Sequence, residues 1–125
     1  DAREAYESLE PAAGTVVRET AKAMEFDRSE YETRVTPEVI ETVRDALFAS
    51  LLAVTVDSRE AFEDWRDDYD GEVVEIGSGN VDRVVWHAPG FADEAVAATF
   101  QDEPDAAIGT LRRQAFGRLY REVVR

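Results

Sequence analysis

The sequence contains no cysteine, one histidine and one lysine, and no long hydrophobic segment. Without cysteine there is no disulfide framework, no thiolate metal site and no cysteine nucleophile. A single histidine, His87, excludes a metal site or a proton relay that needs two histidines of one chain. The longest apolar run, 46–56, contains two hydroxyl side chains and is too short to cross about 30 Å of hydrocarbon. We therefore expect no membrane partner.

The spacing of residues in the sequence excludes three further kinds of binding site. Lys22, the only lysine, does not follow a glycine-rich loop, which excludes a P-loop. The glycines at 77–79 begin a dinucleotide-like pattern, but Asp82 stands where the third glycine belongs. In the acid-rich segment 57–75, the best calcium-loop alignment places Arg66 at the first ligand position. The sequence therefore predicts no cofactor and no metal ligands.

Acidic side chains outnumber basic ones by 28 to 14, which gives a formal charge of −14. At 125 residues and 44% hydrophobic composition, the chain is long and apolar enough for one domain over 1–125. Carboxylates hold water well, whereas a lysine stem exposes four carbons that concentrated salt drives together. The composition is typical of a protein that stays soluble in molar salt.

In these respects the chain resembles the small acidic cytoplasmic proteins of halophilic archaea, in particular one of their uncharacterised families. The resemblance is compositional, covers the whole chain and includes no functional motif. It implies a cytoplasmic location rich in potassium chloride and no known activity.

The first half of the chain has the periodicity of helices. An amphipathic stripe over 2–24 is interrupted by Pro11, which either kinks one helix or starts a second; the unbroken phase of the stripe favours a kink. Segment 26–35 is predicted to be a loop or a single turn. Thr36 and Pro37 mark the start of a central helix that continues to Val54.

In the second half of the chain, one more predicted helix is followed by segments in which apolar residues have the spacing of strands. A helix over 59–69, capped by Asp57 or Ser58, is predicted to end at Gly71. Two β-rich runs, 72–76 and 81–88, flank a turn over 77–80 and predict a hairpin. In that hairpin, four apolar residues share one face: Val74, Ile76, Val84 and Trp86.

A third strand over 95–101 is favoured over a short helix, and a long last helix covers 103–124. The predicted fold class is α+β and predominantly helical. Four or five helices pack on an antiparallel sheet of two or three strands that precedes the long C-terminal helix. Both faces of the predicted hairpin are apolar, so a second copy of the chain is expected to cover one of them, as in a homodimer.

Two groups of residues are candidate functional sites. One is a pocket for a small anion or an enzyme site, in which arginines bind the anion and a histidine titrates. This candidate needs four side chains to converge on one cleft: Arg83, Trp86, His87 and Arg112. Arg112 lies on the apolar face of the last helix, so we expect a carboxylate or a carbonyl group to pair with it.

The second candidate is a basic face on the last helix, formed by Arg118, Arg121 and Arg125. Nucleic-acid binding requires these arginines to be exposed without acidic partners; the alternative is that they bridge to the acidic body of the protein. Counterion release contributes little in molar salt, so we do not expect a nucleic-acid partner. The leading hypothesis is a cytoplasmic, non-catalytic protein-interaction or regulatory homodimer.

Overall fold

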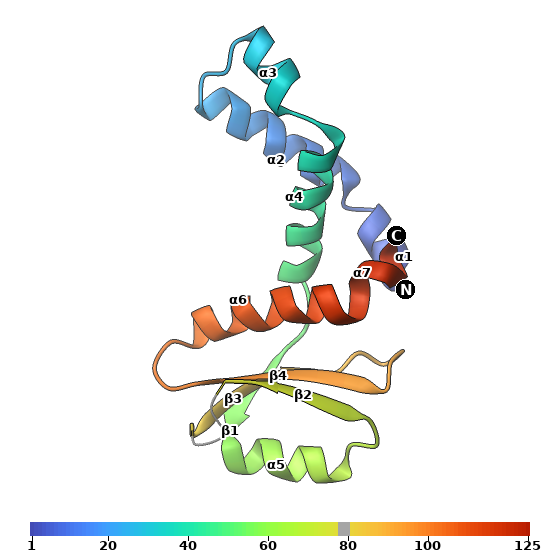
Figure 1. Ribbon diagram of the computed structural model, residues 1–125, viewed down its shortest axis with the longest axis vertical. Coiled ribbons are helices and arrows are strands. Elements are labelled where there is room, and N and C mark those ends of the chain that lie inside the picture. Colours follow the sequence, from blue (N-terminus) through green and yellow to red (C-terminus); the bar gives the residue numbers. More distant parts are fainter. Residues whose placement is uncertain (78–80) are drawn as a thin grey trace. The chain divides into compact units, whose positions relative to one another are not determined.

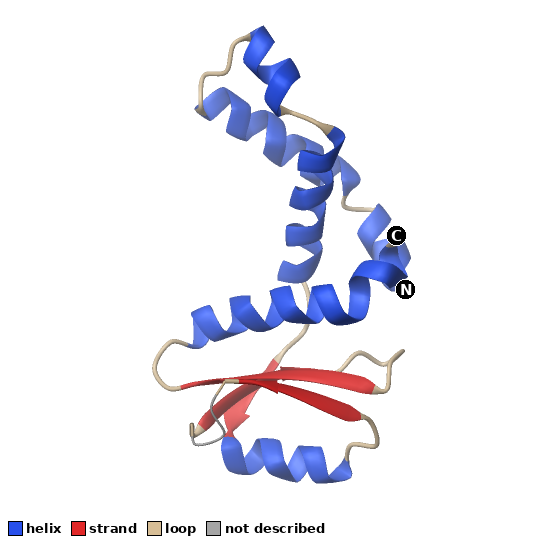
Figure 2. Cartoon of the chain, in the orientation of Figure 1, coloured by secondary structure: helices blue, strands red, loops and turns tan. Residues whose placement is uncertain are grey.

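The computed structural model describes residues 1–77 and 81–125, and it confirms an α+β fold that is predominantly helical. The chain divides into two compact units. Residues Asp1–Leu51 and Glu122–Arg125 form the helical unit, and Leu52–Arg121 form the α/β unit. Figure 1 traces the chain through both units, and Figure 2 shows that the strands belong to the α/β unit.

The helical unit begins with two helices, α1 (Ala2–Glu7) and α2 (Glu10–Ala23). The Asp1 side chain caps α1 by accepting from the Glu4 amide at 2.9 Å. Pro11 lies in the first turn of α2, where its missing amide hydrogen leaves no helical bond unmade. Pro11 therefore starts a second helix, and the kink that the hydrophobic stripe favoured is wrong.

Two more helices complete this unit, α3 (Arg28–Arg34) and α4 (Pro37–Ser50). Helix α3 lies where we predicted a loop or a single turn, and Asp27 caps it by accepting from the Glu30 amide at 2.8 Å. The predicted start of α4 is confirmed, because the Thr36 hydroxyl accepts from the Val39 amide. Its end at Ser50 comes before the predicted Val54, because the following segment joins the sheet.

The core of the helical unit lies where α4 packs against α1 and α2. Tyr6 and Phe48 are buried there with their rings edge to face at 5.7 Å. The Tyr6 hydroxyl donates to the Asp45 carboxylate at 2.5 Å, so the one polar atom of the Tyr6 side chain is satisfied. Small residues of α2, Ala13, Val17 and Ala21, fill the rest of the interface.

The α/β unit contains four strands rather than two or three: β1 (Thr55–Ser58), β2 (Glu72–Ile76), β3 (Arg83–His87) and β4 (Glu94–Phe100). Their order in the sheet is β1-β3-β4-β2. Strand β2 pairs in parallel with β4, and β3 lies antiparallel between β1 and β4. The predicted hairpin of 72–76 with 81–88 is therefore wrong, and its turn residues 78–80 lie outside the described residues. The strand predicted over 95–101 is confirmed as β4.

A helix covers each face of the sheet, α5 (Arg59–Asp68) on one side and α6 (Pro104–Ala115) on the other (Figure 1). The cluster under α5 joins six residues: Phe62, Trp65, Val73, Val84, Trp86 and Ala97. Because side chains alternate along a strand, Val74 and Ile76 point to the α6 face, not to the face that Val84 and Trp86 share. Both apolar faces are thus covered within one chain, and the sheet needs no second copy as a cover.

The boundaries of the two helices that cover the sheet differ in detail from the predicted ones. Ser58 caps α5, as predicted, but the helix ends at Asp68 with Tyr69 as its cap, and Gly71 follows two residues later. A side chain at Gly71 would overlap the carbonyl group of Asp93, so glycine is needed for close packing and not as the helix cap. The predicted last helix is confirmed, with π-helical residues Phe116–Tyr120 between α6 and α7 (Arg121–Val124).

Candidate functional site

His87, at the end of β3, is buried and bonded through both ring nitrogens. Its Nδ1 atom lies 2.5 Å from the carbonyl oxygen of Ala53, and its Nε2 atom lies 2.6 Å from the hydroxyl oxygen of Tyr120. A carbonyl oxygen can only accept, so Nδ1 carries the proton and Nε2 accepts from the Tyr120 hydroxyl. The two bonds fix one neutral tautomer of the imidazole.

The surroundings also favour the neutral form of His87. Burial lowers the pKa of the imidazole and outweighs the opposing effect of the bond to Ala53, and the nearby charge of Arg112 adds a smaller lowering effect. Burial likewise raises the pKa of the Tyr120 hydroxyl, so this group stays protonated and donates. Both ring nitrogens of His87 are therefore engaged in hydrogen bonds within the fold.

Arg112 lies close to this site and is paired as its position on the apolar face requires. Its Nε atom donates to the carbonyl oxygen of Leu52 at 3.0 Å. Arg112 and His87 therefore bind the carbonyl groups of two consecutive residues, Leu52 and Ala53, in the segment that leads into β1. We call these two bonds the carbonyl clamp.

Trp86 and Arg83 lie elsewhere on β3. Trp86 points to the opposite face of the sheet, where its ring contacts Phe62 and Trp65 in the core beneath α5. Arg83 pairs with Phe100 at the other end of the strand, and its guanidinium lies 5.6 Å from the centre of the Phe100 ring. The structure thus brings His87 and Arg112 to adjacent carbonyl groups, whereas Trp86 and His87 line one hollow beside β1 that includes neither Arg83 nor Arg112.

The three arginines of the proposed basic face also have different surroundings. Arg118 lies 3.8 Å from the Glu94 carboxylate, and Arg121 lies over the Phe116 ring. Arg125 pairs with the Asp45 carboxylate at 2.5 Å and with Glu41 at 2.8 Å. Acidic partners are therefore present at Arg118 and Arg125, which is the arrangement expected of cations that bridge to the body of the protein.

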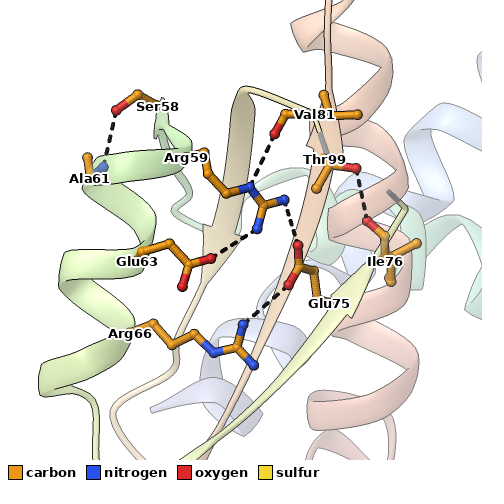
Figure 3. Close-up of polar contacts among 9 residues, drawn as sticks. All are labelled: Ser58, Arg59, Ala61, Glu63, Arg66, Glu75, Ile76, Val81 and Thr99. Carbon is orange, nitrogen blue, oxygen red and sulfur yellow. Dashed lines mark hydrogen bonds and ion pairs between the residues drawn. The ribbon is translucent and has the colours of Figure 1, made fainter. Parts of the chain in front are cut away.

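A second polar cluster, which the sequence analysis missed, lies on the α5 face of the sheet (Figure 3). Glu75 of β2 accepts from Arg59 at 2.7 Å and from Arg66 at 3.3 Å. Arg59 also pairs with Glu63 at 3.1 Å and donates to the carbonyl oxygen of Val81. The spacing of Arg59, Glu63 and Arg66 along one helix was visible in the sequence, but Glu75 is reached only through the fold. The cluster fixes α5 to the sheet.

The described residues also form several hollows. One of about 440 Å³ lies where β2 and β4 end and α6 begins, and acidic residues Asp102 and Glu103 line it. One of about 270 Å³ lies beside β1, next to Trp65 and His87. Another, of about 400 Å³, lies in the helical unit between α2, α3 and α4 and is lined mainly by aliphatic side chains. We call it the α2–α4 groove.

Neither a metal cluster nor a membrane-spanning helix occurs in the part of the chain that the structure describes. Over residues 1–77 and 81–125, no three His, Asp or Glu side chains come together in a way that suits a metal ion. Among the helices in that range, none combines the length and the apolar character that a membrane span needs.

Together these observations define an α+β protein of two units in which two of the candidate residues, His87 and Arg112, bond backbone carbonyl groups. A family model matches residues 1–121, and the chain belongs to that family, the Family of unknown function (DUF5809). A search of curated proteins and a search of solved structures gave no match.

Proposed function

We propose that the protein is a non-catalytic protein-interaction or regulatory protein that works as a homodimer in a salt-rich cytoplasm. The support for a role without catalysis is the use of its polar groups. His87 and Arg112 are engaged by the carbonyl clamp, and Arg59 is engaged by Glu75. An acidic surface with a charge of −14 supports the salt-rich setting.

We propose that the dimer forms through β1, one of the two edge strands of the sheet. Within the described part of the sheet, strand β1 has one neighbour, β3, and all four of its residues are exposed. An uncovered edge presents unpaired backbone groups, which a second edge strand can satisfy. This single observation carries the proposal, because the two faces of the same sheet are already covered by α5 and α6.

A second copy fits this edge by symmetry. Antiparallel pairing of β1 with itself about a two-fold axis places Thr55 opposite Ser58 and Val56 opposite Asp57. The two Asp57 carboxylates then do not face each other, so the arrangement avoids the repulsion of like charges in directly opposed positions. The hollow beside β1 gives further surface for contacts next to the paired edges.

Sedimentation equilibrium in molar potassium chloride tests the proposal. We expect a mass of about twice 14.0 kDa for the protein. The variant Val56→Asp places a carboxylate opposite Asp57 and should return the mass to that of a monomer. Val123→Asp is the matched control, since Val123 is 45% exposed and far from β1 in the sequence. A monomer for the unaltered chain at micromolar concentration would refute the dimer, and equal masses for both variants would remove the β1 edge as its interface.

A further inference from the structure

The α2–α4 groove carries an inference that does not depend on the proposed dimer. Its walls come from three helices, with α2 on one side, α4 on the other and the end of α3 closing the groove. Three of its apolar side chains remain substantially exposed: Val16 at 41%, Met24 at 58% and Val39 at 39%. A volume of about 400 Å³ is within the range of small-molecule sites. The groove is therefore an apolar surface of ligand size that the helical unit leaves open.

The polar side chains of the groove narrow the choice of ligand. Its lining includes one charged residue, Arg34, and one hydroxyl, Thr20. The Thr20 hydroxyl already donates to the carbonyl oxygen of Val16 at 2.8 Å. The Arg34 guanidinium lies 5.5 Å from the centre of the Phe26 ring and has no carboxylate within ion-pair distance among the described residues. Arg34 thus provides positive charge that nothing in the helical unit neutralises.

A second arginine lines a hollow that Phe26 also borders. Arg18 lines an adjoining hollow of about 240 Å³ that shares Phe26 and Ala21 with the groove. Its guanidinium donates to the Thr15 hydroxyl at 3.3 Å, and again no described carboxylate lies within 4.0 Å. Phe26 therefore borders two hollows, and each contains a guanidinium without an acidic partner.

This arrangement is specific to the groove. In the helical unit, whose residues are all described, the other basic side chains each have a carboxylate within 4.0 Å: Arg3, Lys22, Arg28, Arg44 and Arg125. Acidic residues outnumber basic ones in this unit, so partners for Arg18 and Arg34 were available in the sequence. The two cations without an acidic partner both line these hollows, where the third lining cation, Lys22, is paired with Glu19.

We propose that the α2–α4 groove binds a small organic anion with an apolar body and a carboxylate head. The apolar body lies against Val16, Met24 and Val39, and burial of those side chains supplies most of the affinity. The carboxylate pairs with Arg34, whose planar guanidinium can donate two parallel hydrogen bonds to it. Concentrated salt strengthens the apolar contribution and screens the ionic one, so the apolar walls dominate in molar salt.

Titration with octanoate, monitored through the NMR signals of the protein's methyl groups, tests this site. In 0.1 M potassium chloride we expect saturable shifts of the Val16, Val39 and Met24 methyl signals. Arg34→Gln should weaken octanoate binding about tenfold, because it removes a charge-assisted hydrogen bond. Octanol, which has the same apolar chain without the charge, should bind the unaltered protein and Arg34→Gln equally.

Arg28→Gln is the matched control, since Arg28 begins the helix that Arg34 ends and its side chain is 94% exposed. It should leave octanoate binding unchanged. Val39→Asp, which places a carboxylate in the groove, should abolish binding. This second variant tests the site independently of whether Arg34→Gln folds. The proposal is overturned if octanoate shifts no groove methyl signal, or if Arg34→Gln and Arg28→Gln bind it equally. Shifts that depend on protein concentration and not on octanoate would instead make the groove a contact between copies.

Discussion

The Nε2 atom of His87 accepts a hydrogen bond from the hydroxyl group of Tyr120 across 2.6 Å, which joins the end of β3 to the π-helical segment. The other ring nitrogen is bound to Ala53, so three separate stretches of the α/β unit meet at one imidazole. The bond to Ala53 places a proton on Nδ1, and burial lowers the pKa of the imidazole and so favours its neutral form.

The first prediction concerns pH. The folded pKa of His87 lies below its ordinary value of about 6.5, so its stabilising contribution is complete above that pH and is lost as pH falls through it towards the folded pKa. Urea unfolding at pH 7.5 and pH 5.0 should show a larger loss of stability for the unaltered protein than for His87→Gln. An equal loss in both proteins would show that other groups account for the pH dependence.

The second prediction concerns the carbonyl clamp. Arg112→Met removes the donor to the carbonyl oxygen of Leu52, a residue only 7% exposed, and should lower the free energy of unfolding by about 1–3 kcal/mol. The control is Arg113→Met one position later, because Arg113 is exposed and bonds only its helical neighbour Thr110. This control should change stability by less than about 0.5 kcal/mol. Chemical denaturation compares the two, and equal effects would contradict the role of the clamp.

The third prediction concerns the cluster in Figure 3. Glu75→Gln removes the charge that Arg59 and Arg66 share, and at 20% exposure of the Glu75 side chain we expect a loss of about 1–2 kcal/mol. Glu72→Gln, an exposed position in the same strand, should stay within about 0.5 kcal/mol of the unaltered protein. Repeating both unfolding curves in molar salt should reduce the difference, because salt screens partly exposed ion pairs.

The fourth prediction concerns close backbone packing at the start of β2. Gly71→Ala forces a methyl group against the Asp93 carbonyl and should cost about 1–3 kcal/mol. Gly90→Ala, where an added carbon meets no atom within 4 Å, should have an effect below about 0.5 kcal/mol. Thermal unfolding of both variants measures the contrast. A tolerated Gly71→Ala would show that the turn before β2 can shift.

The fifth prediction concerns salt. The distance over which charges interact falls from about 30 Å at 0.01 M to about 3 Å at 1 M, so self-repulsion of the −14 charge weakens. The melting temperature should therefore rise between dilute buffer and molar potassium chloride. An unchanged or falling melting temperature would contradict the view that the acidic surface suits a salt-rich cytoplasm.

Local signals in the sequence predicted the elements that depend on neighbouring residues. The caps at Thr36 and Ser58 and the strand over β4 were found because a capping side chain or an alternating pattern lies within a few residues of its effect. Helix α3 was missed because its cap, Asp27, is followed by few apolar residues, and the amphipathic pattern that marks a helix is weak there.

Long-range pairing was not predictable in the same way. Strands β2 and β3 look like a hairpin because glycines separate them, yet β2 pairs with β4 from farther along the chain. The same limit applies to the sites. The sequence indicated that Arg112 needs a partner, but the carbonyl group of Leu52 becomes that partner only in the fold. The open groove near Arg34 required the positions of three helices.

The π-helical turn at Phe116–Tyr120 has a consequence for how the chain can vary in length. Its backbone bond joins the amide of Arg121 to the carbonyl of Phe116, one residue more than a regular turn encloses. Loss of a single residue within it would restore ordinary winding and leave the last helical residues facing the same way, because the wider turn already encloses one residue more than an α-helical turn. Buried Val124 would then stay buried, so this turn is a place where the helix can lose one residue and keep the same face inward.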